Sequence, residues 1–289
     1  MTKMIATPSR TKEILDRYSL RAKKNFGQNF LIEPGIVEKI AQNAIIEHPC
    51  VVMEIGPGIG ALTQALATYA DKVVSFEIDS RLIDVLNTEL SEYDNIEIRL
   101  QDFLELDLKQ EVDNYKKEGY HVYIAANLPY YITTPLLFKI FEAQADIEAI
   151  TVMMQKEVGD RFSASVNTKD YNALSIISQY RCEIRNVMKV PKSVFNPKPN
   201  VDSCVLQFKF KTNTDIQDEE AFFLMVKACF KQRRKTILNN YGEYLNDKSK
   251  AKSILGLANI AENARGESLT LETFKKLYEV QTNENILLR

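Results

Sequence analysis

The chain has 289 residues, of which 45% are hydrophobic and 26% are charged, and its formal net charge is −2. This balance is typical of a globular protein with enough chain for one large or two smaller domains. It excludes a uniformly basic coat for nucleic acid, so any such surface must come from local clusters of Lys and Arg.

The first of these clusters is at the N-terminus, where residues 1–24 carry seven Lys or Arg and no apolar stretch of a signal peptide. No apolar run approaches the ~18 residues of a membrane span. The four cysteines form no C-x-x-C pair and there are only two histidines. We therefore expect reduced thiols, no metal site, no membrane partner and a cytoplasmic location.

Apolar runs alternate with helical patterns through the first two thirds of the chain. Continuous apolar runs are typical of parallel strands that are buried on both faces. They predict strands at 51–55, 73–77, 96–100, 122–126 and 149–154, with helices at 61–69, 80–90 and 134–143. Repeated strand–helix units predict an α/β fold with a doubly wound, mostly parallel sheet.

Two extended runs follow, "CEIRNVMKV" (182–190) and "VDSCVLQFKF" (201–210), with no long helix predicted between them. They predict an antiparallel addition at one edge of the sheet.

The pattern then changes to helices alone, predicted at 219–231, 233–245, 248–258 and 271–281. The last has Thr270 as its N-cap, with Leu269 and Phe274 placed as a hydrophobic staple. We place a domain boundary near residue 212. Residues 1–211 then form the sheet domain with its basic N-terminal arm, and residues 212–289 form a smaller all-helical domain.

The stretch "VVMEIGPGIGALTQAL" reads as a strand, a glycine turn and a helix. Gly56, Gly58 and Gly60 permit a tight turn and close approach of the backbone to a ligand at a helix N-terminus. The run also fits the dinucleotide fingerprint G-x-G-x-x-A, which by itself is a weak signal.

Carboxylates follow the glycine turn at the ends of the next two strands. Glu77 ends the second strand, where it can accept hydrogen bonds from both hydroxyls of a ribose, and Asp102 follows the third, where it can accept from an adenine amine. Glu54, inside the first strand, needs a partner such as a ligand amine or loop amides. We therefore predict an adenosine-containing cofactor, and at this point a nicotinamide or a sulfonium cofactor would both fit.

The stretch "AANLPYYITTP" (125–135) favours the sulfonium cofactor. The exocyclic amine of adenine is a poor nucleophile, and two acceptors for its protons would free its lone pair. Asn127 offers an amide oxygen and Leu128 a carbonyl, Pro129 removes a competing N–H, and Tyr130 offers a face for the base. The base must leave its stack to reach such a pocket. An ordinary proline turn is the alternative for this stretch taken alone.

The segments "KKNFGQNFL", "EIGPGIGALT", "NLPYYIT" and "VFNPKPNVDS" resemble, in order, the motifs of the ribosomal RNA adenine N6-dimethyltransferases, which use S-adenosyl-L-methionine. The resemblance covers residues from about 20 to 210. Two branches share these motifs: the small-subunit enzyme and the large-subunit enzymes that confer macrolide resistance. "CFKQRRKTILNN" and "ARGESLTLETFKKL" resemble the small-subunit branch.

The resemblance implies roles for individual residues. The segment of Asn29 and Leu31 would close over the cofactor, and Phe195 would be a second aromatic surface opposite Tyr130. The cofactor or its edge would be contacted by Gly56, Gly58, Glu77, Asp102 and Asn127.

The predicted function is dimethylation of the N6 amines of two adjacent adenosines in a hairpin loop near the 3′ end of small-subunit (16S) rRNA, with a role in small-subunit biogenesis. The N-terminal arm and the cluster Lys231, Arg233, Arg234 and Lys235 would bind phosphates, and we expect a monomer. A large-subunit methyltransferase and a ribosome-assembly factor without catalysis are the alternatives. A dehydrogenase is the weakest, because it leaves "NLPYY" unexplained.

Overall fold

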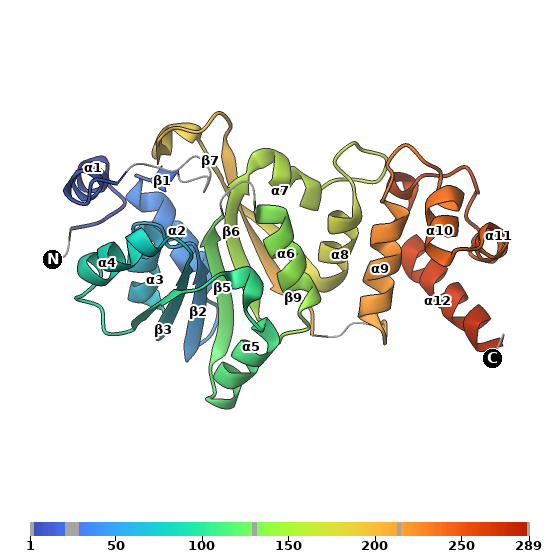
Figure 1. The fold of residues 1–289 in the computed structure, drawn as a ribbon, viewed down its shortest axis with the longest axis horizontal. Coiled ribbons are helices and arrows are strands. Elements are labelled where there is room, and N and C mark those ends of the chain that lie inside the picture. Colours follow the sequence, from blue (N-terminus) through green and yellow to red (C-terminus); the bar gives the residue numbers. More distant parts are fainter. Residues whose placement is uncertain (1–2, 21–28, 129–131, 213–214, 288–289) are drawn as a thin grey trace. The chain divides into compact units, whose positions relative to one another are not determined.

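The computed structural model describes residues 3–20, 29–128, 132–212 and 215–287, with side chains described as far as residue 283 (Figure 1). The chain divides into two compact units. The first comprises Met1–Gly159 and Ile184–Phe210, and the second comprises Asp160–Glu183 and Lys211–Arg289.

The first unit is built on a seven-stranded sheet with the strand order β4-β3-β2-β5-β6-β9-β7. The strands are β2 (Cys50–Ile55), β3 (Lys72–Glu77), β4 (Ile96–Leu100), β5 (His121–Asn127), β6 (Ala149–Gln155), β7 (Cys182–Val190) and β9 (Ser203–Phe210). The first five pair in parallel, and β9 is antiparallel to β6 with Phe208 opposite Ile150. The predicted parallel strands and the antiparallel edge are confirmed.

Helices cover both faces of this sheet, and this is why its central strands read as continuous apolar runs. All six residues of β2 are buried. One face carries α2 (Pro34–Ala44), α3 (Ala61–Tyr69) and α4 (Ser80–Glu89), and the other carries α5 (Leu108–Lys117) and α6 (Thr133–Glu142) (Figure 1). The helices predicted at 61–69, 80–90 and 134–143 are confirmed to within about one residue at each end, whereas α2 and α5 were not predicted.

Short elements complete the first unit. A further helix, α1 (Pro8–Arg17), packs through Ile14 in the same apolar cluster as α4. The strands β1 (Phe30–Leu31) and β8 (Phe195–Asn196) pair antiparallel, with Leu31 opposite Phe195. The 3-10 turns η2 (Phe103–Glu105) and η3 (Lys192–Val194) follow β4 and precede β8.

The second unit is helical. It contains α8 (Ala173–Arg181), α9 (Glu219–Cys229), α10 (Ile237–Leu245), α11 (Lys248–Leu257), η4 (Gly266–Ser268) and α12 (Leu271–Leu287), and α7 (Lys156–Phe162) crosses its first junction. Its core includes the fully buried rings of Phe222, Tyr241 and Phe274.

The last helix begins as the sequence predicts. The hydroxyl of Thr270 accepts a hydrogen bond from the Thr273 N–H at 3.1 Å, and the staple residues Leu269 and Phe274 are both buried. The division of the chain differs from the predicted one, because residues Asp160–Glu183 belong to the helical unit. Their helix α8 contacts α9 and α12, which are remote in sequence. In the part of the chain that the structure describes, no helix has the length and apolarity to cross a membrane.

Candidate functional site

The glycine turn between β2 and α3 has the left-handed backbone that its composition predicts. Gly56, Gly58 and Gly60 have φ angles of 68°, 61° and 90°, which residues with a side chain rarely adopt. A Cβ at Gly60 would lie 3.1 Å from Leu90 of the core, whereas one at Gly56 would meet nothing within 4 Å. Gly60 therefore serves packing, and Gly56 presents bare backbone to open space.

Glu77 connects this turn to the end of β3. Its Oε2 accepts a hydrogen bond from the Gly58 N–H at 3.2 Å, and its Oε1 accepts from the N–H groups of Ile78 at 2.9 Å and Asp79 at 2.8 Å. The side chain is nearly buried, and burial raises its pKa although these hydrogen bonds oppose the shift. Three backbone donors therefore hold this carboxylate in place.

Glu54 lies in the middle of β2 and is 1% exposed. The hydroxyl of Ser75 on β3 donates to its Oε2 at 2.7 Å, a partner that was not predicted from the sequence, and Glu54 also lines the cavity at the carboxyl ends of the parallel strands. Burial raises its pKa to about 7. Glu54 is therefore held as a largely desolvated carboxyl beneath the glycine turn.

Asp102 caps the turn that follows β4, where its Oδ1 accepts from the Leu104 N–H at 2.8 Å. The next residue, Phe103, is buried and packs edge-on against Phe76 with ring centroids 5.4 Å apart. The half-buried carboxylate of Asp102 therefore stands beside an aromatic wall, an arrangement that suits a planar, partly polar ring.

Asn127 is the last residue of β5 and is half-buried. The Leu128 N–H donates to the Met153 carbonyl of β6 at 3.0 Å, which fixes the backbone just beyond the strand. Phe195 is 3% exposed and packs in the core cluster that also contains Leu31. The predicted residues Pro129 and Tyr130 lie outside the described residues.

A single cavity in the first unit brings the predicted residues together at the carboxyl ends of the parallel strands. Its lining includes Asn29, Leu31, Gly56, Gly58, Glu77, Asp102, Asn127, Leu128 and Phe195. It also includes Phe30, Ile78 and Phe103, which were not predicted. A signal for two of them was present, because Ile78 and Phe103 directly follow the strand-end carboxylates Glu77 and Asp102.

The predicted phosphate-binding residues are not among the residues that line this cavity; they belong to the second unit and are Lys231, Arg233, Arg234 and Lys235. All four are exposed, on the turn between α9 and α10, because α10 begins at Ile237 rather than at the predicted residue 233. The sequence run contains no acid, but the fold brings two to it. Lys231 Nζ is 2.6 Å and Lys235 Nζ 3.7 Å from Glu243 carboxylate oxygens, and Arg233 Nε is 3.7 Å from Glu267 Oε2.

Two arginines of the basic N-terminal arm form ion pairs within the first unit. Arg10 forms an ion pair with Glu89 of α4, and Arg17 Nη1 lies 3.0 Å from Glu89 Oε1. The Glu89 side chain is only 1% exposed, so these arginines hold α1 on α4. Lys23 and Lys24 lie outside the described residues.

The sequence of the chain is similar to those of ribosomal RNA methyltransferases. The family model described as "Ribosomal RNA adenine dimethylase" matches residues 19–279. The chain is 47% identical over 283 residues to "Ribosomal RNA small subunit methyltransferase A" of Staphylococcus aureus (strain Newman), covering 96% of this chain and 95% of the relative. It is 46% identical over 280 residues to the protein of the same name from Oceanobacillus iheyensis, covering 95% of each.

Solved structures agree. A dimethyladenosine transferase from Plasmodium falciparum is similar with a TM-score of 0.72 and 29% identity over 87% of this chain and 97% of that one. The 23S rRNA methyltransferase ErmE is similar with a TM-score of 0.64 and 27% identity over 87% of this chain and 99% of that one.

Proposed function

The chain belongs to the ribosomal RNA adenine dimethylase family, and from this premise we propose that it dimethylates the N6 amines of two adjacent adenosines in a hairpin loop near the 3′ end of 16S rRNA. S-adenosyl-L-methionine is the methyl donor, and the modification belongs to small-subunit biogenesis. The observation that carries this proposal is the cavity in which a glycine turn, two strand-end carboxylates and Asn127 meet. The high identity to relatives named for the small subunit favours that substrate over the large subunit.

The residues of the cavity fit the cofactor. A Cβ at Gly56 would meet open space, so the backbone there is available to a ligand that approaches closely. Asp102 would accept a hydrogen bond from the adenine amine, and Phe103 and Ile78, which line the same cavity, would supply the apolar surface for the ring. The segment of Asn29 and Leu31 closes over it. When bound, the cofactor supplies a methyl group on a sulfonium, which is an excellent leaving group.

Glu77 accepts a hydrogen bond from the ribose, and its existing hydrogen bonds limit how many ribose hydroxyls it can bind. A carboxylate has about four lone-pair sites, and three of those on Glu77 already accept backbone N–H groups. Oε1 holds two of these donors, so the remaining site is on Oε2. Glu77 therefore accepts one ribose hydroxyl while it holds the glycine turn, rather than the two expected from the sequence.

Asn127 and Leu128 prepare the adenine amine for reaction. The Asn127 amide oxygen accepts one amine proton and the Leu128 carbonyl accepts the other, which draws the nitrogen toward tetrahedral geometry and frees its lone pair. The bond from Leu128 N–H to Met153 fixes this backbone before the base arrives. Catalysis is therefore mainly positioning and preorganised acceptors. After one transfer the amine keeps one N–H, so the same acceptors can orient it again.

Aromatic side chains hold the base that has left its stack. Tyr130 stacks on one face of the adenine, and Phe195 forms the opposite surface. Pairing of β8 with β1, where Phe195 lies opposite Leu31, ties this surface to the segment that closes over the cofactor.

The helical unit binds the RNA backbone and makes no contacts that depend on base sequence. The exposed cations Lys231, Arg233, Arg234 and Lys235 contact phosphates, and the unpaired loop supplies the selectivity. Lys231, Arg233 and Lys235 each lie near a carboxylate, whereas Arg234 forms no ion pair with any of the described residues.

Methylation of isolated ribosomal subunits tests the proposal. The protein, with labelled cofactor, is incubated with small and large subunits from a strain whose rRNA lacks the modification, and the product is mapped by mass spectrometry. We expect label on N6 of two adjacent adenosines in 16S rRNA. Label on the large subunit alone would support the macrolide-resistance branch, and no transfer to either subunit would support an assembly factor without catalysis.

A further inference from the structure

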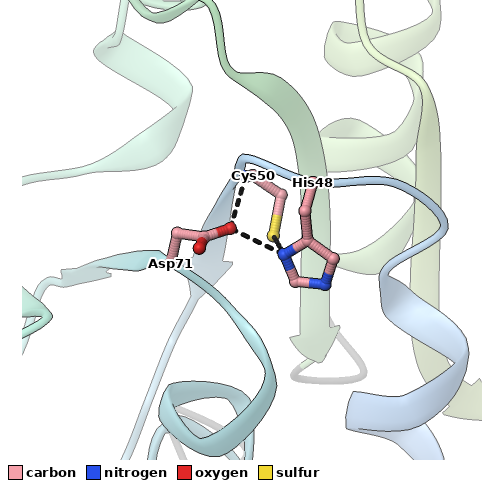
Figure 2. Close-up of side chains that lie close together, drawn as sticks. All are labelled: His48, Cys50 and Asp71. Atoms are coloured by element: carbon pink, nitrogen blue, oxygen red, sulfur yellow. Dashed lines mark hydrogen bonds and ion pairs between the residues drawn. The ribbon is translucent and has the colours of Figure 1, made fainter.

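A second group of reactive side chains lies at the opposite end of the sheet from the cavity. Cys50 is the first residue of β2, His48 precedes it by two residues, and Asp71 directly precedes β3 (Figure 2). The cavity is at the carboxyl ends of these strands. Six residues of β2, at about 3.3 Å each, separate the two places by roughly 20 Å, so this cluster is not part of the methyl-transfer site.

The three side chains point toward one another (Figure 2). Asp71 Oδ2 lies 2.7 Å from His48 Nδ1 and accepts from the Cys50 backbone N–H at 2.8 Å. Cys50 Sγ lies 3.6 Å from the same His48 Nδ1. One sulfur, one nitrogen and one carboxylate oxygen thus lie within 4.8 Å of one another.

The geometry argues against an activated thiol. In a thiol–imidazole–carboxylate relay, the carboxylate holds one ring nitrogen and the thiol uses the other. Here both Asp71 and Cys50 face Nδ1 of His48, so the imidazole cannot pass a proton between them. A single cation at the centre would instead satisfy all three atoms at once.

We propose that His48, Cys50 and Asp71 bind a Zn²⁺ ion, with a fourth position open to water. Thiolate sulfur, imidazole nitrogen and carboxylate oxygen are the ligand atoms that zinc prefers. Usual bond lengths in a tetrahedral site place sulfur and nitrogen about 3.6 Å apart, and nitrogen and oxygen about 3.3 Å apart. The sulfur–nitrogen separation already has this value. The Nδ1–Oδ2 pair must open by about 0.6 Å from its 2.7 Å hydrogen bond.

The backbone around the cluster is fixed while two of its side chains remain accessible. The Pro49 carbonyl accepts from the His121 N–H at 2.8 Å, and the Glu47 N–H donates to the Tyr123 hydroxyl at 2.9 Å. The His48 and Asp71 side chains are 54% and 44% exposed, so they can rotate to admit an ion, and Cys50 is buried beneath them.

Binding releases the thiol proton of Cys50 to solvent and joins the start of β2 to the start of β3. Because the unfolded chain lacks the assembled site, zinc binding stabilises the fold by an amount that grows with the logarithm of the zinc concentration above the dissociation constant. The expectation that the chain has no metal site relied on cysteine spacing, and this cluster has a single cysteine.

Metal titration of the whole protein tests the proposal. Zinc binding is measured by competition with a chromophoric chelator, and Co²⁺ reports a thiolate ligand through its charge-transfer absorption. We expect one ion per chain, a thiolate–Co²⁺ band and a rise in the unfolding temperature. His48→Gln changes an exposed ligand and should weaken zinc binding by more than the roughly 10- to 100-fold that loss of an outer-shell partner costs.

The matched control is His121→Gln. His121 is the other of the two histidines of the chain, begins β5 beside Cys50 and contacts Glu148 rather than the cluster. It should bind zinc like the wild type. Equal affinity in His48→Gln and wild type would overturn the proposal, as would the absence of a thiolate–Co²⁺ band. Methyl transfer should be unchanged in both variants, so this test is independent of the proposed function.

Discussion

Replacing Glu77 with alanine should weaken cofactor binding by a predictable amount. The carboxylate has one site left for the ribose, because it already accepts backbone N–H groups from Gly58, Ile78 and Asp79. Loss of one hydrogen bond to a charged acceptor costs about 1.5–3 kcal/mol. Since about 1.4 kcal/mol corresponds to a tenfold change, the dissociation constant should rise about 10- to 150-fold.

The same substitution removes the partner of the glycine turn. Three backbone N–H groups lose their acceptor, although water in the cavity can reach them, so we expect the free energy of unfolding to fall by about 1–3 kcal/mol. The fold itself should persist. Cofactor affinity must therefore be measured well below the unfolding temperature of the variant.

Calorimetric titration with the cofactor, combined with thermal unfolding followed by circular dichroism, separates the two effects. Asp84→Ala is the control, because Asp84 is an exposed carboxylate on α4 outside the cavity, and it should bind the cofactor like the wild type. A Glu77→Ala protein that is folded and binds the cofactor with wild-type affinity would refute the placement of the ribose at Oε2.

Three further substitutions test other parts of the account. Glu54→Gln should remove a pH dependence of the free energy of unfolding. The pKa of this buried carboxyl rises from 4.5 to about 7 in the folded protein, so the wild type loses about 3 kcal/mol of stability as pH increases through that window. Urea unfolding at pH 5 and pH 8 should show that the variant is stabilised relative to wild type only at pH 8. Joint replacement of Arg233, Arg234 and Lys235 by alanine should weaken RNA binding and leave cofactor affinity unchanged. The slope of log binding constant against log salt concentration should become shallower by roughly 0.7–0.9 per lost phosphate contact. A slope equal to that of the wild type would mean that these cations only face solvent. Glu243→Gln frees two lysines of the same turn and should strengthen RNA binding at low salt, whereas unchanged filter-binding affinity would show that Glu243 does not compete with phosphate.

Much of the first unit could be predicted from the sequence, because its strands and turns depend on residues that are close together in the chain. Buried parallel strands are continuous apolar runs, and a turn with three positive φ angles needs glycine. The carboxylates at strand ends could be placed in one cavity because parallel strands end at the same edge. Even so, the Ser75 partner of Glu54 depends on the register between β2 and β3.

What the sequence did not predict depends on contacts between distant residues. The arginines of α1 were assigned to RNA, but the fold brings Glu89 to Arg10 and Arg17. The basic turn appeared free of acids until α10 placed Glu243 beside it. Residues 160–183 gave no signal of belonging to the helical unit, because α8 finds its partners α9 and α12 far along the chain.

The single-turnover rate of methyl transfer by Asn127→Ala tests the central claim most directly. Cofactor and small-subunit RNA are both saturating, so only the chemical step is compared. Loss of one preorganised acceptor should lower this rate roughly 100- to 1,000-fold, while RNA affinity changes little because the base can still stack. Asn114→Ala, on an exposed position of α5, is the control and should react like the wild type. Transfer by Asn127→Ala at a near wild-type rate would show that the asparagine is only a turn residue and would contradict the mechanism.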